Sequence, residues 1–182
     1  RGAAVIILIK IGGTLLDSVE IRRRLTSEIA RAVETGIRVV VVHGGGKQMT
    51  RFLGSQGIPT QFVNGLRVTT PDVLDAVLKV LAGSVNQELV ASFIVNGAPA
   101  VGLTGMDALL TEAQQMNQEL GFVGKPIRSD PRLLSLLMQN GYIPVVACVA
   151  GNRAGEFYNV NADQMAVSVA TAIAADKLLF LT

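Results

Sequence analysis

Short, strongly apolar runs alternate along the chain with longer stretches in which apolar residues recur every three or four positions. The runs Val5–Ile9 and Ile37–Val42 are typical of strands that are buried on both faces of a sheet. The stretch between them places four apolar side chains on one helical face, at Ile21, Leu25, Ile29 and Val33. Because parallel strands need a crossover that can hold a helix, this region predicts parallel βαβ units.

A different pattern follows a short helix predicted over Lys47–Gln56. Asn64-Gly65 separates two short β-prone runs, which is the strongest local signal for a β-hairpin. Thr70 and Pro71 then combine an N-cap hydroxyl with a proline suited to the first helical turn. These two residues predict the start of a long helix that runs to about Val95.

The C-terminal half returns to short strands and helices. Strands are predicted at Ala100–Leu103, Leu109–Ala113, Phe122–Val123, Tyr142–Val149 and Leu178–Leu181, and helices at Arg132–Gln139 and in the alanine-rich segment that ends near Ala175. The 182 residues contain no repeats, low-complexity tracts or linkers. We therefore expect one α/β unit over residues 1–182.

Composition agrees with this class of fold. Apolar residues make up 49% of the chain and charged residues only 16%, which suits strands covered on both faces. The net charge of +2 gives no argument for a nucleic-acid or membrane partner. The single cysteine, Cys148, lies in an apolar run and predicts a buried, inert thiol. No targeting or membrane-spanning segment is recognisable, so we expect a soluble, cytoplasmic protein.

Two glycine turns carry the candidate chemistry. Lys10 and Gly12-Gly13 follow the first predicted strand, and His43-Gly44-Gly45-Gly46 follows the second. Residues without a Cβ allow backbone N–H groups to converge on an anion at the start of a helix, and Lys10 adds a cation. Ligands of open α/β sheets bind at the carboxyl ends of the strands. The two turns therefore predict one surface that handles a phosphoryl group.

Other functions of glycine-rich loops fit less well. A His-Gly-Gly-Gly segment also forms the oxyanion hole of some esterases, but the chain has no Gly-x-Ser-x-Gly nucleophile elbow and only one histidine. Neither a Walker A motif nor Gly-x-Gly-x-x-Gly is present, which argues against the generic P-loop and dinucleotide-binding classes. His43 itself is interpreted as a hydrogen-bonded structural residue rather than a base.

Polar residues further along the chain have two interpretations each. Arg67 lies just beyond the hairpin turn, where it could grip a carboxylate with two hydrogen bonds or remain a surface charge. Asn159, Asn161 and Asp163 gather where a strand leads into a helix. One of them suffices to cap the helix, and spacing alone leaves open whether the others bind a ligand.

Taken together, these segments resemble the amino acid kinase family, and within it the acetylglutamate kinases. The resemblance rests on eight stretches that span nearly the whole chain: Lys10–Gly13, Val42–Gly46, Asn64–Thr69, Leu81–Asn86, Val101–Leu103, Leu120–Gly124, Gly141–Val146 and Tyr158–Gln164. Asn-Gly-Leu-Arg-Val-Thr and Asn-Val-Asn-Ala-Asp are the most specific pair. The family implies a three-layer αβα sandwich with a mostly parallel central sheet and a β-hairpin lid.

The resemblance also implies catalytic and phosphoryl-binding roles. Lys10 and Asp163 would be the catalytic residues, with Asp163 orienting the ammonium group of Lys10. The backbone around the transferred phosphoryl group would come from the two glycine turns, at Gly12, Gly13, Gly44 and Gly45.

Four residues would border the acylamino acid in the family's arrangement. Gly45 and Gly46 would lie beside it, Arg67 would hold one of its carboxylates, and Asn159 would bind it from the far side. The implied reaction transfers a phosphoryl group from ATP to the γ-carboxylate of N-acetyl-L-glutamate in arginine biosynthesis. Mg²⁺ would be carried by the nucleotide and not by a protein metal site. A carboxylate is already a nucleophile, so this reaction needs no general base.

The family pattern continues beyond Thr182 with an ATP-binding lobe. We therefore expect residues 1–182 to form an N-terminal lobe for acylamino-acid binding and dimerisation, which alone binds ligand without turnover. Alternatives are a catalytically dead binding or regulatory module and another amino acid kinase, such as an acetylaminoadipate, carbamate or aspartate kinase. A homodimer or higher homo-oligomer is expected, and the helix from Pro71 to Val95 serves equally well as a dimer surface or as ordinary packing.

Overall fold

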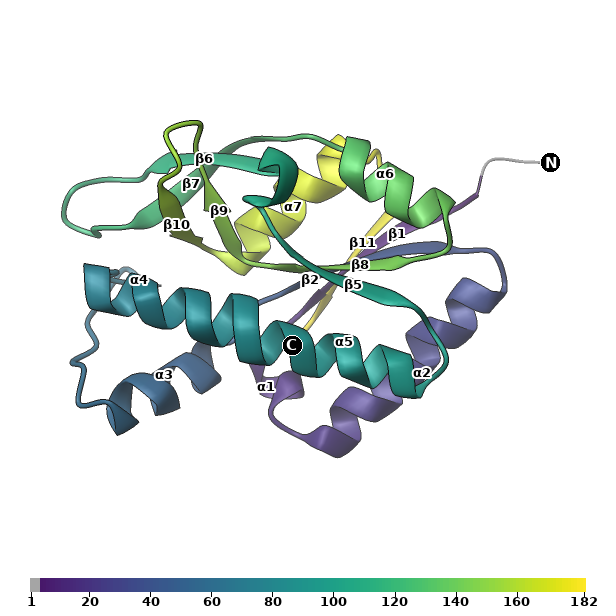
Figure 1. The fold of residues 1–182 in the computed structure, drawn as a ribbon, viewed down its shortest axis with the longest axis horizontal. Coiled ribbons are helices and arrows are strands. Elements are labelled where there is room, and N and C mark those ends of the chain that lie inside the picture. Colours follow the sequence, from purple (N-terminus) through teal and green to yellow (C-terminus); the bar gives the residue numbers. More distant parts are fainter. Residues whose placement is uncertain (1–3) are drawn as a thin grey trace.

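Five parallel strands form the central sheet, in the order β11-β1-β2-β8-β5 (Figure 1). Their bounds are β1 Ile6–Ile11, β2 Arg38–His43, β5 Ala100–Thr104, β8 Ile143–Ala147 and β11 Lys177–Leu181. The structure is a computed structural model and describes residues 4–182. The predicted βαβ rhythm is confirmed, with strand ends displaced by one or two residues from the predicted ones.

Helices cover both faces of this sheet and make the three predicted layers. On one face lie α2 (Val19–Glu34) and a continuous helical rod made of α4 (Pro71–Val77), the π-helical segment η1 (Leu78–Val85) and α5 (Asn86–Val95). On the other face lie α6 (Arg132–Gln139) and α7 (Ala162–Ala172). The alternation of strand side chains divides the core accordingly, since Val41 packs toward the first face and Val40 and Val42 pack toward the second.

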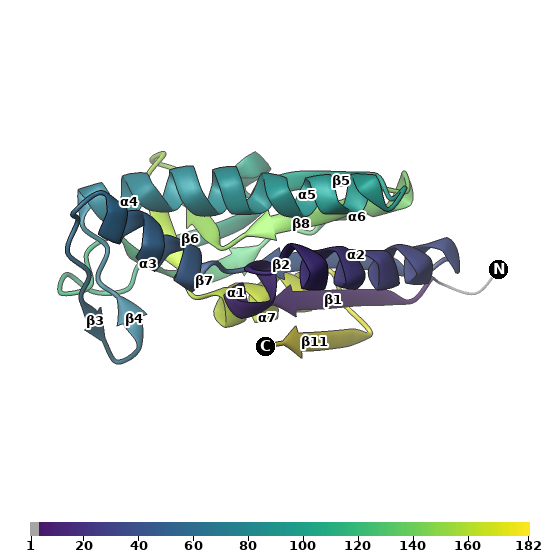
Figure 2. The ribbon, with the colours of Figure 1, turned by 90° about the horizontal axis from the view of Figure 1, so that it is seen from below.

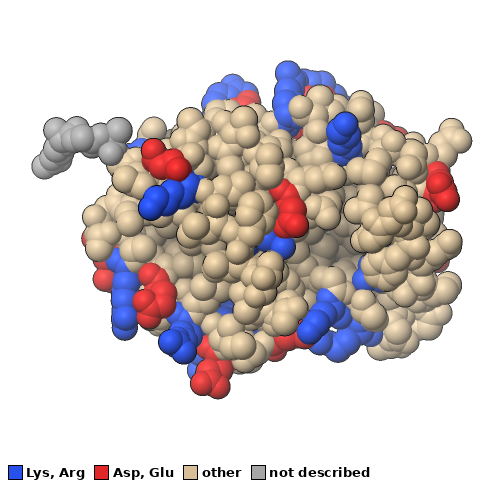
Figure 3. All heavy atoms as spheres, turned by 180° about the vertical axis from the view of Figure 1, so that it is seen from behind, with Lys and Arg blue, Asp and Glu red and all other residues tan. Residues whose placement is uncertain are grey.

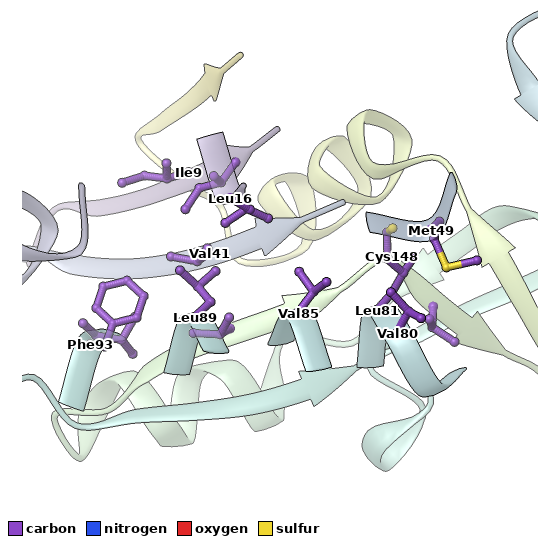
Figure 4. Packing of buried hydrophobic residues seen from close by; sticks show 14 of the residues in the cluster. Ile9, Leu16, Val41, Met49, Val80, Leu81, Val85, Leu89, Phe93 and Cys148 are labelled. Atoms are coloured by element: carbon purple, nitrogen blue, oxygen red, sulfur yellow. The ribbon is translucent and has the colours of Figure 1, made fainter. Parts of the chain in front are cut away.

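The long rod supplies much of the first core layer. Figure 4 shows Leu81, Val85, Leu89 and Phe93 pointing from the rod toward Val41 and its neighbours on the sheet. All of these side chains are at most 5% exposed. Among residues 4–182 this is the one helical stretch long and apolar enough to suit a membrane, and 44% of its most apolar window is buried inside the fold. Its apolar character therefore has an explanation in core packing.

A second, smaller sheet was not predicted from the sequence. It closes on itself from β6 (Thr111–Gln115), β7 (Val123–Ser129), β9 (Val149–Gly151) and β10 (Phe157–Val160). The predicted single strand Tyr142–Val149 is wrong, because the chain leaves the central sheet at Cys148. The Cys148 amide donates to the carbonyl of His43 on β2, whereas Val149 already pairs with Asn159 on β10.

Two smaller predictions also fail. The strand predicted at Phe122–Val123 runs from Val123 to Ser129, although Lys125 and Pro126 have low β-propensity, because β6 pairs with it along this length. Ile21 does not share the buried face of α2, since its side chain is 45% exposed near the start of the helix.

The hairpin prediction is confirmed. β3 (Phe62–Val63) and β4 (Leu66–Arg67) pair antiparallel across Asn64 and Gly65, whose φ angles of 49° and 78° are those of a type I′ turn. Figure 2 shows the hairpin projecting from the body beside α3 (Gly46–Ser55), with α1 (Gly13–Leu16) nearby. The remaining element is a 3₁₀ turn, η2 (Asp107–Leu109). We call residues Phe62–Arg67 the hairpin arm.

Charge is distributed evenly over the surface that Figure 3 displays. Lysine and arginine side chains alternate there with aspartate and glutamate, and large uncharged areas separate them. This face offers no extended basic patch of the kind that binds a nucleic-acid backbone.

Candidate active site

A cavity of about 260 Å³ opens where β1 and β2 end. These strands are neighbours, with Lys10 opposite Val42 and Ile11 opposite His43, so the turns that follow them leave the sheet side by side. Every site residue predicted from the sequence except Asp163 lines the cavity: Lys10, Gly12, Gly13, Gly44, Gly45, Gly46, Arg67 and Asn159. The structure therefore brings both glycine turns into one site.

The two turns are packed against each other too closely for side chains. A Cβ on Gly13 would lie 3.2 Å from the amide nitrogen of Gly46 and 3.3 Å from Cα of Gly45. A Cβ on Gly45 would lie 2.5 Å from Cδ2 of Leu81. Among residues 4–182, no acceptor contacts the amides of Gly13 and Gly45. We call Gly12–Gly13 with Gly44–Gly46 the glycine floor, and the free N–H groups of Gly13 and Gly45 are of the kind that suits an anion.

Lys10 supplies the cation beside the glycine floor. Its Nζ lies 2.9 Å from Oδ1 of Asp163, in the first turn of α7. The lysine side chain is only 12% exposed and the aspartate 58%. Asp163 thus fixes the ammonium group from the solvent side. Asn161 is the N-cap of α7, because its Oδ1 accepts from the amides of Asp163 and Gln164.

Arg67 is buried and lines the same cavity. Its Nη2 donates to the carbonyl of Gly46 at 3.2 Å and to Oγ1 of Thr50 at 2.9 Å, and its guanidinium lies 4.6 Å from the ring centroid of Phe62. Nη1 is buried without a partner. Burial lowers the pKa of Arg67 below its ordinary value. An unpaired donor on a buried cation is suited to a carboxylate ligand.

Asn159 reaches the cavity from β10 and holds the base of the hairpin arm. Its Nδ2 donates to Oγ1 of Thr69 at 3.1 Å, and this hydroxyl donates to the carbonyl of Arg67 at 2.9 Å. The amide of Thr69 donates to the carbonyl of Leu120 at 3.0 Å. Thr69 is fully buried and was not assigned a role from the sequence, although it ends the Asn64–Thr69 motif.

The histidine and the cysteine are both closed to solvent. Burial lowers the pKa of His43 to about 4 and raises the pKa of Cys148 to about 12. A neutral, fully hydrogen-bonded imidazole and a protonated thiol agree with the structural roles predicted for them.

Gln48 does not line the cavity but contacts the glycine floor, which the sequence did not reveal. Its Nε2 donates to the carbonyl of Gly13 at 3.1 Å and to Oδ1 of Asp17 at 2.8 Å, and its Oε1 is buried without a partner. Asp17 in turn accepts two hydrogen bonds from Arg51, which lower its pKa. In the sequence, a glutamine one turn into a helix is indistinguishable from a solvent-facing residue.

The α/β sandwich and its paired glycine turns are the arrangement that the sequence led us to expect of a phosphoryl-handling class of protein. The chain belongs to the amino acid kinase family, whose family model matches residues 5–182. Its relatives within this family are acetylglutamate kinases, as the sequence motifs predicted. The Solibacter usitatus acetylglutamate kinase is 61% identical over 176 residues, which cover 97% of this chain and 68% of that enzyme.

A further relative supports the assignment, and a solved structure supports the fold. The chloroplastic acetylglutamate kinase of Arabidopsis thaliana is 42% identical and covers 97% of this chain, which in turn spans 51% of that protein. The crystal structure of smu.665 from Streptococcus mutans superposes with a TM-score of 0.89 at 30% identity, covering 97% of this chain and 72% of the other. The chain thus spans about half to two thirds of the length of these curated relatives.

Proposed function

We propose that residues 1–182 form the acylamino-acid lobe of an acetylglutamate kinase, which transfers a phosphoryl group from ATP to the γ-carboxylate of N-acetyl-L-glutamate. The observation that carries the proposal is the polarity of the cavity. Its lining combines Lys10 and the free amides of the glycine floor with Arg67, whose Nη1 is buried without a partner. A ligand with two carboxylates matches a cavity lined by two such cations.

The reacting γ-carboxylate is assigned to the Lys10 side. Phosphoryl transfer asks a protein mainly for positioning and for stabilisation of negative charge. The ammonium of Lys10, held by Asp163, and the amides of Gly13 and Gly45 supply that stabilisation. Asp163 is a positioning residue, because it acts through Lys10 and does not line the cavity.

The α-carboxylate is assigned to Arg67. Its Nη1 is free while Nη2 is anchored to Gly46 and Thr50, so the guanidinium is held in place before the ligand arrives. Asn159 borders the same cavity and would contact the ligand from the β10 side. A bound carboxylate would provide the partner that the buried Nη1 lacks.

The nucleotide is expected to bring Mg²⁺ with it. Among residues 4–182, no group of three or more histidine, cysteine, aspartate or glutamate side chains is arranged to hold a metal. The phosphate oxygens of ATP are ligands that Mg²⁺ prefers. When bound, the metal would neutralise charge on those phosphates, and the residues of this lobe would act on the acceptor.

We also propose that the protein is cytoplasmic and forms a homo-oligomer. Ile94 and Val95 leave apolar surface at the end of the long rod, 55% and 70% exposed. Light scattering coupled to size-exclusion chromatography tests this part, and a monomer at micromolar concentration would contradict it.

Ligand titration tests the proposed function itself. Isothermal titration and thermal unfolding are followed with N-acetyl-L-glutamate, N-acetyl-L-2-aminoadipate and ATP. We expect saturable binding and a raised melting temperature with N-acetyl-L-glutamate. Preference for the longer aminoadipate would favour the alternative kinase, and no response to either acylamino acid would refute the assignment. The Arg67→Ala variant is the control for binding in this cavity.

A further inference from the structure

His43 is a buried residue to which the proposed function gives no task. It is the only histidine of the chain and is fully buried at the end of β2. Both ring nitrogens have partners. Nδ1 lies 2.8 Å from the carbonyl oxygen of Gly44, and Nε2 lies 2.9 Å from Nδ2 of Asn86.

These partners determine which nitrogen carries the proton. The carbonyl of Gly44 can only accept, so Nδ1 of His43 donates. Nδ2 of Asn86 also donates to the carbonyl of Val145 at 3.0 Å, which fixes the orientation of this amide independently. Nε2 of His43 must therefore accept from Asn86. The imidazole is neutral and protonated on Nδ1.

The hydrogen bond from His43 determines the orientation of the next peptide group. The described residues contain no cis peptide bond, and in a trans peptide the C=O and N–H groups point in opposite directions. Because His43 holds the carbonyl of Gly44, the amide of Gly45 is directed away from the imidazole. Gly45 is buried and lines the cavity together with Lys10. A buried amide without an acceptor is costly unless a ligand completes it.

Asn86 is itself placed by the surrounding fold. It is the first residue of α5, directly after the π-helical segment η1, and it spans from β2 to β8 through its two donated hydrogen bonds. Gly102 on β5 makes room for it, because a Cβ there would collide with Oδ1 of Asn86. Short π-helical segments occur frequently near functional sites.

We propose that Asn86 and His43 are positioning residues that hold the Gly44–Gly45 peptide with its amide facing the anion in the cavity. This inference rests on the proposed function, in which the anion is the γ-carboxylate and then the transferred phosphoryl group. Asn86 fixes the tautomer of His43, His43 holds the carbonyl of Gly44, and the amide of Gly45 is thereby aimed before the ligand binds. Neither side chain touches the reacting atoms.

The first test determines the tautomer of His43 directly in the native chain. Two-bond ¹H–¹⁵N correlation spectra distinguish a protonated ring nitrogen from an unprotonated one, and the chain holds a single imidazole. We expect a protonated Nδ1 and an accepting Nε2. Free neutral histidine has both tautomers in solution, so a protonated Nε2 in the folded protein would overturn the proposal.

The second test compares two substitutions of His43, each of which can keep only one of its two hydrogen bonds. In His43→Asn, the side-chain nitrogen stands as many bonds from Cα as Nδ1 does, so the bond to Gly44 can persist. In His43→Gln, the amide reaches the position of Nε2, so only the bond to Asn86 can persist. We expect His43→Gln to weaken N-acetyl-L-glutamate binding about tenfold more than His43→Asn. Equal losses in the two variants would overturn the proposal.

The readouts separate this inference from the proposed function. Amide spectra show whether each variant is folded, and the shift of the Gly45 amide on titration reports its contact with the ligand. A native chain with a protonated Nδ1 that binds neither N-acetyl-L-glutamate nor its homologue would refute the proposed function and support the orientation of the peptide. A chain that binds N-acetyl-L-glutamate while its histidine carries the proton on Nε2 would support the proposed function and overturn the orientation of the peptide.

Discussion

The glycine floor and the hairpin arm face the same cavity but are built in opposite ways. Behind the floor lie fully buried residues of the central sheet, and His43 there has no solvent exposure. The arm consists of two strands of two residues each, and Phe62 is 52% exposed. Its connection to the body runs mainly through Arg67 and Thr69. The floor is thus backed by tightly packed structure, whereas the arm has few contacts to lose.

This difference matches two chemical needs. Charge stabilisation in a transition state depends on donors that are fixed before the reaction. Ligand entry and release instead require an element of low local stability. The first three substitutions below separate the floor from the arm, and the largest effect is expected for the first.

The largest effect is expected when the cation of the floor is removed. In an intact enzyme that contains these residues, Lys10→Ala should lower kcat by about 10²–10³-fold and change the KM for N-acetyl-L-glutamate far less. Trapping the acyl phosphate with hydroxylamine measures the rate. Lys79→Ala is the matched control, because Lys79 forms an ion pair with Asp75 on the exposed side of the helical rod. Near-normal turnover of Lys10→Ala would remove Lys10 from the chemistry.

Asp163→Ala tests the positioning of that cation. The substitution removes the carboxylate 2.9 Å from Nζ of Lys10 and leaves the ammonium in place. We expect kcat to fall by about tenfold or more, with ligand affinity nearly unchanged. Asp163→Asn serves as the conservative variant and should recover part of the rate, because its amide oxygen can still accept from Lys10. A selective loss of affinity would contradict a positioning role.

Substitution in the hairpin arm should affect binding. Arg67→Ala should weaken the affinity for N-acetyl-L-glutamate by about 10–100-fold, since hydrogen bonds to a charged partner are lost. Arg67→Lys keeps the positive charge but lacks the paired N–H donors of the guanidinium. Its affinity should lie between those of the native chain and Arg67→Ala. Calorimetric titration measures all three proteins. An unchanged dissociation constant for Arg67→Ala would show that the arm does not hold the ligand.

Gly45 and Gly54 lie near opposite ends of α3, one at the floor and one away from it, so substituting each compares the packing at these two places. Gly45→Ala should lower the free energy of unfolding by about 1–3 kcal/mol, because the new Cβ meets Leu81. Gly54→Ala meets nothing within 4 Å and should be neutral or stabilising. Urea unfolding of both variants measures the difference. Equal stabilities would mean that the floor tolerates side chains.

Acidification tests the burial of His43. Its pKa is about 4 in the folded protein against an ordinary value of 6.5, so between these pH values the unfolded chain binds a proton that the folded chain does not. Stability therefore falls as pH drops through this window, by about 1 kcal/mol between pH 6 and pH 5. The same urea series on His43→Asn should lack this contribution. Identical slopes for the two proteins would contradict a buried neutral imidazole.

The sequence predicts the site best where local chemistry determines the backbone. Asn64-Gly65 requires a turn with positive φ, and the glycines of the floor follow strands whose apolar runs are plain. What it cannot predict depends on distant pairs. His43 and Asn86 meet across 43 positions, and the strand break at Cys148 arises because β2 and β10 compete for neighbouring residues. The small sheet is likewise closed by distant pairs, Asn159 with Val123 and Glu112 with Gly151. Lys125 and Pro126 join it through their antiparallel partners on β6, which override their low β-propensity.

A crystal structure of the chain with N-acetyl-L-glutamate tests most directly whether the cavity binds a carboxylate at each side. The account predicts the γ-carboxylate within hydrogen-bond distance of the Gly45 amide and Nζ of Lys10, and the α-carboxylate on Nη1 of Arg67. A ligand bound in the reverse direction, or outside this cavity, would contradict it.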